Sequence, residues 1–198
     1  MKMDSTADKS IEYKGLIKKR LSDYRYNHSV NVADAAVHLA EKYGADKKKA
    51  FIAGILHDIM KEETADIQIK YIEASGHKMT AVERGNHSVL HQMSGAAYCA
   101  SRLHIDDADI INAVRYHTTG RAGMTLLEKV IYTADFISAE RSYPDVDVMR
   151  KLAEESLESA MLYSLKYTIK DLVKREALIH PDTLNCYNDL LENYIEKE

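Results

Sequence analysis

The sequence predicts an all-α protein. Apolar residues recur at three- and four-residue spacing along nearly the whole chain, which is the period of an amphipathic helix. Only two prolines and eight glycines interrupt this pattern, and no segment shows the alternation of a half-buried strand. No linker, internal repeat or low-complexity segment divides the 198 residues. We therefore expect a single domain, 1–198, built from crossing helices.

The first half of the chain predicts four helices. Gly44 follows the second helix in the position where helices commonly end, and Asp46 is a suitable N-cap for the third. The stretch SGHKMTAVERGNHS (75–88) is expected to be a loop, long enough to border a site. The expected helices cover 11–22, 24–43, a third that begins after Asp46 and carries His57, and 64–74.

The second half of the chain is expected to form further helices, which a turn and a loop interrupt. TTGRAGM (118–124) is expected to form a turn, and Pro144 breaks any helix in SAERSYPDVDV (138–148). Pro181 opens the last helix, because proline is favoured in the first helical turn. The expected helices cover 88–103, 106–117, 125–136, 149–175 and a final segment from 181.

Composition and charge exclude several classes of function. The formal net charge of −4 argues against a general surface for nucleic acid. An apolar run of membrane-spanning length and a signal peptide are both missing from the sequence, which argues against a membrane partner. Cys99 and Cys186 lie far apart without a CxxC motif, which favours a reducing cytosol over a disulfide scaffold or a cysteine zinc site. We expect a cytoplasmic protein.

The stretch AGILHDIM (53–60) places His57 and Asp58 inside an apolar run, where burial of an unpaired charge is costly. Other helices each carry one imidazole or carboxylate on the apolar stripe expected to face the core. These residues are His28, His91, His117 and Asp135. A single inward histidine is more often a hydrogen-bonded core residue. Ionised aspartates among several neutral imidazoles, however, need a compensating cation, so the whole set predicts a metal site.

The order of these residues resembles the HD superfamily of metal-dependent phosphohydrolases. The resemblance implies two metal ions with one shared aspartate. It assigns the first metal ion to His28, His57, Asp58 and Asp135, and the second to His91, His117 and the shared Asp58. Because the ligands are imidazoles and carboxylates without thiolates, we prefer iron, with manganese, magnesium and zinc as the other candidates.

His87 is an alternative to His91, because it lies four residues earlier and would share its helical side if the helix began early. We prefer His91 as the ligand, since VLHQMSGAA (89–97) continues the helical pattern whereas GNHS (85–88) has the composition of a loop and cap. His87 then remains a candidate for contact with the metal ligands or with substrate.

Longer strings narrow the resemblance to the YqeK branch of the superfamily, over nearly all of residues 20–192. The strings are HSVNVADAAVHLAEKYG (28–44), AGILHDIMK (53–61), VLHQMSGA (89–96), RYHTTGRAGMTLLEKVIYTADFISAER (115–141) and IHPDTLNCYNDLL (179–191). The resemblance implies an HD-domain helical bundle, about 20–140, with a C-terminal helical extension, about 146–196, packed on it. It also implies hydrolysis of a phosphoric anhydride bond, splitting diadenosine tetraphosphate symmetrically into two ADP.

Two departures from the branch bear on how the pocket fits its substrate. Gln92 stands where the branch commonly has a glycine. FISAER (136–141) stands where an acidic residue followed by Pro-Gly is more usual.

A dinucleoside polyphosphate is strongly anionic, so cationic and hydroxyl side chains should line its path. Lys61, one turn beyond Asp58, is our candidate for a catalytic and substrate-binding lysine, against the simpler interpretation of a solvated lysine at a helix end. The other candidates for phosphate contact flank the last ligands. They are Thr118, Thr119, Arg121 and Arg141.

Other functions are compatible with the same ligands. An HD phosphohydrolase could act on another nucleotide, although the absence of an HHE…GYP string disfavours a cyclic dinucleotide substrate. A non-catalytic nucleotide- or metal-binding module and an HD-fold di-iron oxygenase are further alternatives. Helix surfaces would allow a homodimer. None of the thirteen tyrosines stands out in the sequence as a stacking partner for a base.

Overall fold

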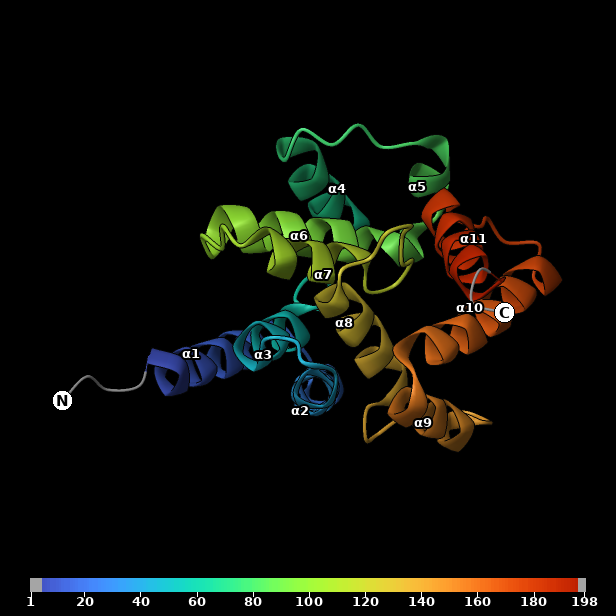
Figure 1. The fold of residues 1–198 in the computed structure, drawn as a ribbon. Coiled ribbons are helices and arrows are strands. Elements are labelled where there is room, and N and C mark those ends of the chain that lie inside the picture. The colour runs from blue at the N-terminus through green and yellow to red at the C-terminus, as the bar shows by residue number, and fades with distance from the viewer. Residues whose placement is uncertain (1–4, 196–198) are drawn as a thin grey trace.

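A computed structural model describes residues 5–195, and all regular secondary structure in this range is helical (Figure 1). The all-α prediction is confirmed. The helices are α1 (Ser5–Arg20), α2 (Asp23–Tyr43), α3 (Lys47–Leu56), α4 (Ala65–Ala74), α5 (Ala81–Gly85), the 3-10 helix η1 (His87–Val89), α6 (Leu90–Arg102), α7 (Ala108–Tyr116), α8 (Leu126–Ile137), α9 (Val146–Glu155), α10 (Leu157–Lys174) and α11 (Pro181–Ile195). None of these helices combines the length and apolarity needed to span a bilayer.

Helix ends lie close to the expected positions where capping residues define them. Gly44 ends α2 with φ of 82°, a left-handed conformation that glycine adopts without steric cost. Asp46 accepts hydrogen bonds from the backbone N–H groups of Lys48 and Lys49 at the start of α3. Ser156 separates α9 from α10 within 149–175, and its hydroxyl caps α10 through Ser159 N.

The segment 75–88 is more ordered than the loop we expected. It contains α5 and the beginning of η1. Thr80 and Glu83 form a reciprocal capping box, in which each side chain accepts a hydrogen bond from the backbone N–H of the other residue. This Thr-x-x-Glu spacing is a recognised helix-start pattern, and our interpretation of the sequence missed it.

The core forms where α2, α3, α7 and α8 cross. Their buried side chains include Val32, Leu56, Val114 and Ile131. α2 and α3 approach closely because Gly54 lacks a side chain: a Cβ there would lie 2.8 Å from the Cα of Ala33. This crossing brings the C-terminal end of α3 against the middle of α2.

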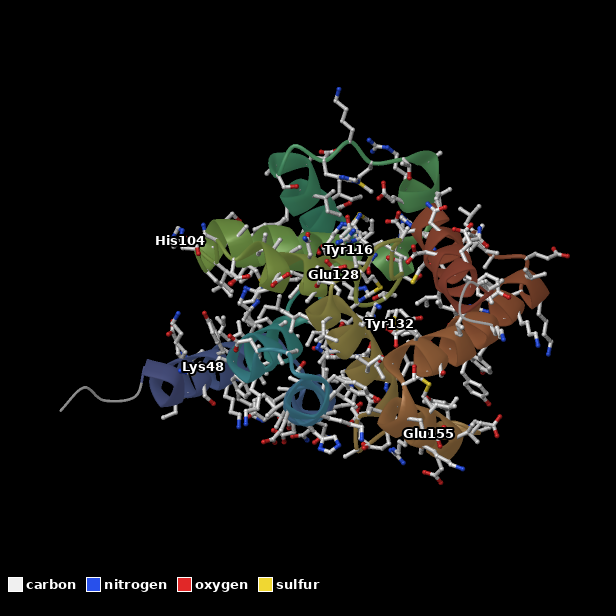
Figure 2. The ribbon with its side chains drawn as sticks, in the orientation of Figure 1. Lys48, His104, Tyr116, Glu128, Tyr132 and Glu155 are labelled. Atoms are coloured by element: carbon white, nitrogen blue, oxygen red, sulfur yellow. The ribbon has the colours of Figure 1, made fainter. Side chains whose placement is uncertain are left out.

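The C-terminal helices pack on the far side of α8 (Figure 1). Tyr132 lies on α8 (Figure 2). Its ring contacts Phe136, and its hydroxyl lies 3.3 Å from Ser164 Oγ on α10. Met161 and Leu165 from α10 and Cys186 from α11 complete this second apolar cluster.

Glu83 on α5 makes a polar connection to α7 and to the residue that precedes α11. Its side chain is 2% exposed and lies 3.0 Å from His77 Nε2, 3.4 Å from His180 Nε2 and 3.5 Å from Arg115 Nη2. Burial would raise the pKa of Glu83, but hydrogen bonds from Thr80 and His77 lower it to about 2. The carboxylate is thus charged and fully partnered at neutral pH.

Candidate metal centre

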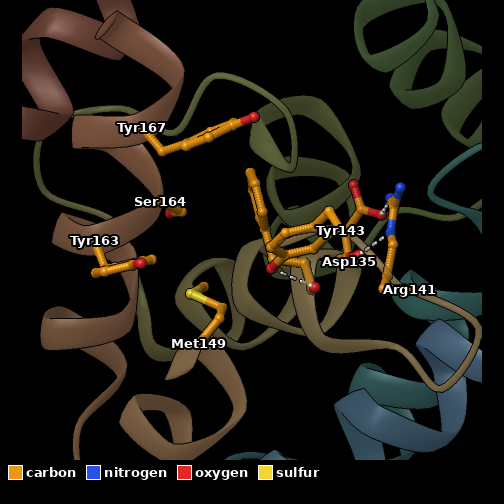
Figure 3. A pocket seen from close by; sticks show the side chains of 8 residues that line it. Asp135, Arg141, Tyr143, Met149, Tyr163, Ser164 and Tyr167 are labelled. Carbon is orange, nitrogen blue, oxygen red and sulfur yellow. Dashed lines mark hydrogen bonds and ion pairs between the residues drawn. The ribbon is translucent and has the colours of Figure 1, made fainter. Parts of the chain in front are cut away.

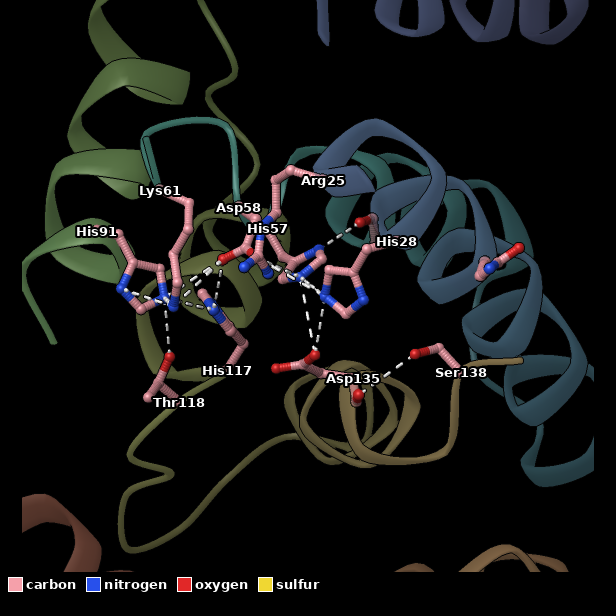
Figure 4. Close-up of polar contacts among 12 residues, drawn as sticks. Arg25, His28, His57, Asp58, Lys61, His91, His117, Thr118, Asp135 and Ser138 are labelled. Atoms are coloured by element: carbon pink, nitrogen blue, oxygen red, sulfur yellow. Dashed lines mark hydrogen bonds and ion pairs between the residues drawn. The ribbon is translucent and has the colours of Figure 1, made fainter. Parts of the chain in front are cut away.

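Four imidazoles and two carboxylates, from three helices and the turns that follow two others, converge at the buried crossing of α2, α3 and α8 with α6 and α7 (Figure 4). His28 lies in α2, His91 in α6 and Asp135 in α8. His57 follows the last residue of α3, and His117 follows the last residue of α7. The cluster is His28, His57, Asp58, His91, His117 and Asp135, the six residues that we predicted to be ligands from the sequence.

One part of the cluster, here called the first ligand group, comprises His28, His57, Asp58 and Asp135. His28 Nε2 lies 3.1 Å from Asp135 Oδ1, 3.2 Å from His57 Nε2 and 3.6 Å from Asp58 Oδ2. His57 Nε2 lies 3.4 Å from the same oxygen of Asp58. Their Nε2 and carboxylate atoms therefore face one another across a few ångströms.

The second ligand group comprises Asp58, His91 and His117. The other carboxylate oxygen of Asp58, Oδ1, lies 3.4 Å from His91 Nε2 and 3.6 Å from His117 Nε2. The two Nε2 atoms are 3.1 Å apart. Each oxygen of Asp58 thus faces a different pair of histidines, as expected of a carboxylate shared between two cations.

Hydrogen bonds orient three of the imidazoles. His57 Nδ1 donates to Gly54 O at 2.7 Å, and His117 Nδ1 donates to Val114 O at 2.8 Å. Both acceptors are carbonyls in the last turn of a helix, which lack partners within the helix. His28 Nδ1 is hydrogen bonded to the carboxylate of Glu140. These bonds leave the Nε2 lone pairs directed into the cluster, the arrangement typical of metal-binding histidines.

The carboxylates are ionised in spite of their burial. Burial by itself would raise the pKa of Asp58, but His57 and Lys61 beside it hold that pKa well below its usual range. Burial opposes ionisation of Asp135 in the same way, and its hydrogen bond with His28 keeps its pKa well below the usual value.

One buried oxygen in the cluster lacks a hydrogen bond. Asp58 Oδ2 accepts one from Arg25 Nη1 at 2.7 Å, whereas Asp58 Oδ1 is buried and accepts none. An ionised oxygen left this way is costly, and a cation placed between it and the two facing imidazoles would satisfy it. The donor set of nitrogen and oxygen without sulfur fits the borderline and hard metal ions.

Our interpretation of the sequence missed Arg25, Asn31 and Glu140. Arg25 lies one turn before His28 on the same face of α2, and this i, i+3 spacing could have indicated it. Asn31 Nδ2 donates to Glu140 Oε2 at 2.7 Å, and Ser138 Oγ donates to Glu140 Oε1 at 2.8 Å. Nothing in the local sequence pairs Glu140 with His28, which is 112 positions away.

Lys61 and Thr118 lie beside the second ligand group. Lys61 Nζ is 3.1 Å from His91 Nε2 and 4.0 Å from Asp58 Oδ1. Thr118 Oγ1 is 3.1 Å from the same nitrogen of His91. Burial and the nearby Lys61 lower the pKa of His91 well below its usual value, so this imidazole is neutral and able to act as a ligand.

The remaining candidates occupy different places. Arg141 lies beside the first ligand group, where its guanidinium pairs with the Asp135 carboxylate and its Nε donates to Asp135 O at 2.9 Å. Arg121 instead pairs with the buried carboxylate of Glu128 at 2.8 Å. Thr119 Oγ1 donates to Gly120 O, and His87 is exposed at the start of η1. The structure does not bring Arg121, Thr119 or His87 into the cluster.

Gln92 holds the turn that carries Thr118. Its Oε1 accepts hydrogen bonds from Thr118 N at 3.0 Å and Thr119 N at 3.2 Å, while its Nε2 donates to Thr119 Oγ1. The side chain is fully buried. Gln92 therefore fixes the backbone of the turn that carries Thr118, whose hydroxyl lies beside His91.

The FISAER segment is held by Arg150 of α9. Its guanidinium donates to the carbonyl oxygens of Ile137, Ser138 and Arg141 at 3.0 to 3.2 Å. Arg150 thus holds, through backbone carbonyls, the loop that places Glu140 and Arg141 beside the first ligand group.

Gln92→Leu is expected to lower the free energy of unfolding by about 2–6 kcal/mol, because the backbone N–H groups of Thr118 and Thr119 lose their acceptor at about 1–3 kcal/mol each. Urea denaturation measures the change. Ser94→Ala is the control, since the Ser94 hydroxyl bonds only within its own helix, to His91 O. Equal stability of Gln92→Leu and wild type would contradict the assigned role.

Comparisons with known proteins agree with this geometry. The model of the HD domain family matches residues 25–140. Symmetrical bis(5'-nucleosyl)-tetraphosphatases of Bacillus subtilis and Staphylococcus aureus are 43% and 34% identical to the chain. Each alignment covers 88% of this chain, with 94% of the first protein and 91% of the second.

A solved structure is also similar. It is the crystal structure of a protein of Clostridium acetobutylicum, described as a predicted HD superfamily hydrolase involved in NAD metabolism. The two chains superpose with a TM-score of 0.90 at 36% identity, over 92% of this chain and 96% of that one.

Proposed function

The chain belongs to the HD domain family, and we propose that it acts as a symmetrical bis(5'-nucleosyl)-tetraphosphatase through the buried cluster of histidines and aspartates. Diadenosine tetraphosphate is its substrate, and two molecules of ADP are its products. The observation that carries the assignment to this site is Asp58, whose two oxygens face two separate pairs of histidines.

The proposal assigns two metal ions to the cluster. The first ligand group holds one ion and the second ligand group holds the other, with Asp58 common to both. Iron is the preferred metal, because four imidazoles and two carboxylates without a thiolate favour a borderline transition metal over magnesium. The unsatisfied Asp58 Oδ1 supports a cation at this position.

When bound, the metal ions supply a nucleophilic oxygen from water near neutral pH and neutralise charge on the phosphate under attack. The chain's own residues bind and orient the polyphosphate. Lys61 and Thr118 lie on the side of His91, and Arg141 lies on the side of Asp135, so phosphates on both sides of the scissile bond have a partner. Attack at one central phosphate releases ADP from each half of the molecule.

Incubation of the metal-loaded protein with diadenosine tetraphosphate tests this function. Chromatography is expected to show ADP as the sole nucleotide product, in the absence of oxygen as well as in air. AMP together with ATP would contradict symmetrical cleavage. No turnover with iron, manganese, magnesium or zinc, despite metal shown to be bound by elemental analysis, would contradict the enzymatic function.

Glu140→Gln is expected to weaken metal binding by about 10- to 100-fold, the usual cost of removing the carboxylate partner of a ligand histidine. The substitution keeps the size of the side chain but removes the charge that faces His28 Nδ1. Metal titration followed by elemental analysis measures the change. Glu154→Gln is the matched control, because Glu154 makes a similar contact with the exposed His38. Identical metal affinity in the two variants would contradict the role of Glu140.

A further inference from the structure

A pocket of about 240 Å³ adjoins the candidate metal centre, and Asp135 and Arg141 belong to both. Figure 3 shows these two residues at one side of the pocket, with Tyr163 and Tyr167 of α10 opposite them. The metal centre therefore opens into a space whose far wall comes from the C-terminal helices.

Aromatic side chains dominate the wall of this pocket. Phe136 comes from α8, Tyr143 from the loop after it, and Tyr163 and Tyr167 from α10. Tyr167 is 61% exposed, so one face of its ring is open to a ligand. Flat apolar walls of this kind bind bases by stacking.

We propose that this aromatic pocket takes one nucleobase of the substrate, stacked against Tyr167 and its aromatic neighbours. The inference rests on the proposed function, because it assumes that the polyphosphate lies at the metal centre. It assigns the placement of the nucleoside to Tyr167 and its aromatic neighbours. The sequence alone does not distinguish these residues from the other tyrosines.

The order of charges along the site matches the order of groups along the ligand. The ionised cluster would hold cations that face the phosphates, Arg141 lies at the boundary with its side chain 31% exposed, and the aromatic wall follows. A nucleotide has the same sequence of anionic phosphate, polar ribose and flat base. Its polyphosphate end and its base would thus each meet a complementary surface.

Two of the hydroxyl groups in the pocket donate to backbone carbonyls. Ser164 Oγ donates to Met161 O at 2.9 Å, and Tyr143 OH donates to Phe136 O at 3.0 Å. Because the lining is mainly aromatic, we expect recognition of the base to rely on stacking more than on hydrogen bonds to its edge. Stacking tolerates different bases, so diguanosine tetraphosphate should be hydrolysed with a KM within about tenfold of that for diadenosine tetraphosphate.

Calorimetric titration of the metal-loaded protein with ADP and with pyrophosphate tests the pocket without turnover. Tyr167→Ala is expected to weaken ADP binding by about 5- to 150-fold, the range for loss of one base–aromatic stack, and to leave pyrophosphate binding unchanged. Tyr167→Phe should retain the affinity of wild type. Val173→Ala is the control, because Val173 has the same 61% exposure on α10 but lies outside the pocket.

Unchanged ADP affinity in Tyr167→Ala, or equal weakening of ADP and pyrophosphate, would overturn the pocket as a base site. A preference of more than about 100-fold for one purine over the other would overturn stacking as its means of recognition. These two outcomes can be distinguished from failure of the proposed function. In that case the wild type would bind ADP through Tyr167 but would not cleave diadenosine tetraphosphate.

Discussion

Asp58→Ala is expected to abolish hydrolysis of diadenosine tetraphosphate and retention of metal together. Asp58 is the residue that both ligand groups share, with Oδ1 and Oδ2 facing different histidine pairs. Loss of a partner that merely orients a ligand costs about 10- to 100-fold, so we expect loss of this shared ligand to lower kcat/KM by more than about 100-fold. Steady-state kinetics and elemental analysis measure the two effects.

The control for this variant is Asp34→Ala, because Asp34 is an exposed aspartate on α2 that is not part of the cluster. It should keep the activity and metal content of wild type. Circular dichroism should show that both variants retain helical structure. An Asp58→Ala protein that keeps its metal, or keeps activity within tenfold of wild type, would contradict the shared-ligand role.

Gly54→Ala is expected to lower the free energy of unfolding by about 1–3 kcal/mol or more, the usual cost of overpacking a buried contact. The new Cβ would lie 2.8 Å from the Cα and 3.2 Å from the N of Ala33. Both are backbone atoms of α2, so the two helices must separate. His28 on α2 and His57 at the end of α3 would separate with them, and metal affinity should fall as well.

Gly15→Ala is the matched control. A Cβ on Gly15, within α1, meets nothing within 4 Å. Because alanine favours helices over glycine by about 1 kcal/mol, this variant should be as stable as wild type or more stable. Urea denaturation of the two variants makes the comparison. Equal stability of Gly54→Ala and Gly15→Ala would contradict the close approach of α2 and α3.

Much of the fold and the cluster follows from local patterns. Gly44 and Asp46 mark the junction of α2 and α3 because capping depends on residues only a few positions apart. His28 and Asp135 were found because each interrupts an apolar helical stripe, and such a stripe must face the core. Where the interaction lies within a helix or at its end, the sequence indicates it.

Other features depend on contacts that no local pattern encodes. Arg121 was a candidate for phosphate contact, but its guanidinium pairs with the buried carboxylate of Glu128, in the first turn of the next helix. Gln92 reaches a turn 26 positions away. The aromatic pocket exists because α10 packs beside α8. These pairings arise from helix packing, so spacing in the chain could not predict them.

The three oriented histidines differ in whether a backbone group or a side chain holds them, and therefore in whether a substitution elsewhere in the chain can remove that partner. His57 and His117 use main-chain carbonyls three residues earlier, which persist whatever side chain those positions acquire. His28 uses the side chain of Glu140, in a loop far along the chain. A substitution of Glu140, in the loop between α8 and α9, therefore removes the support of His28 and leaves the carbonyls that hold His57 and His117 in place. The same buried cluster thus combines one histidine held by a distant side chain with two held by nearby backbone.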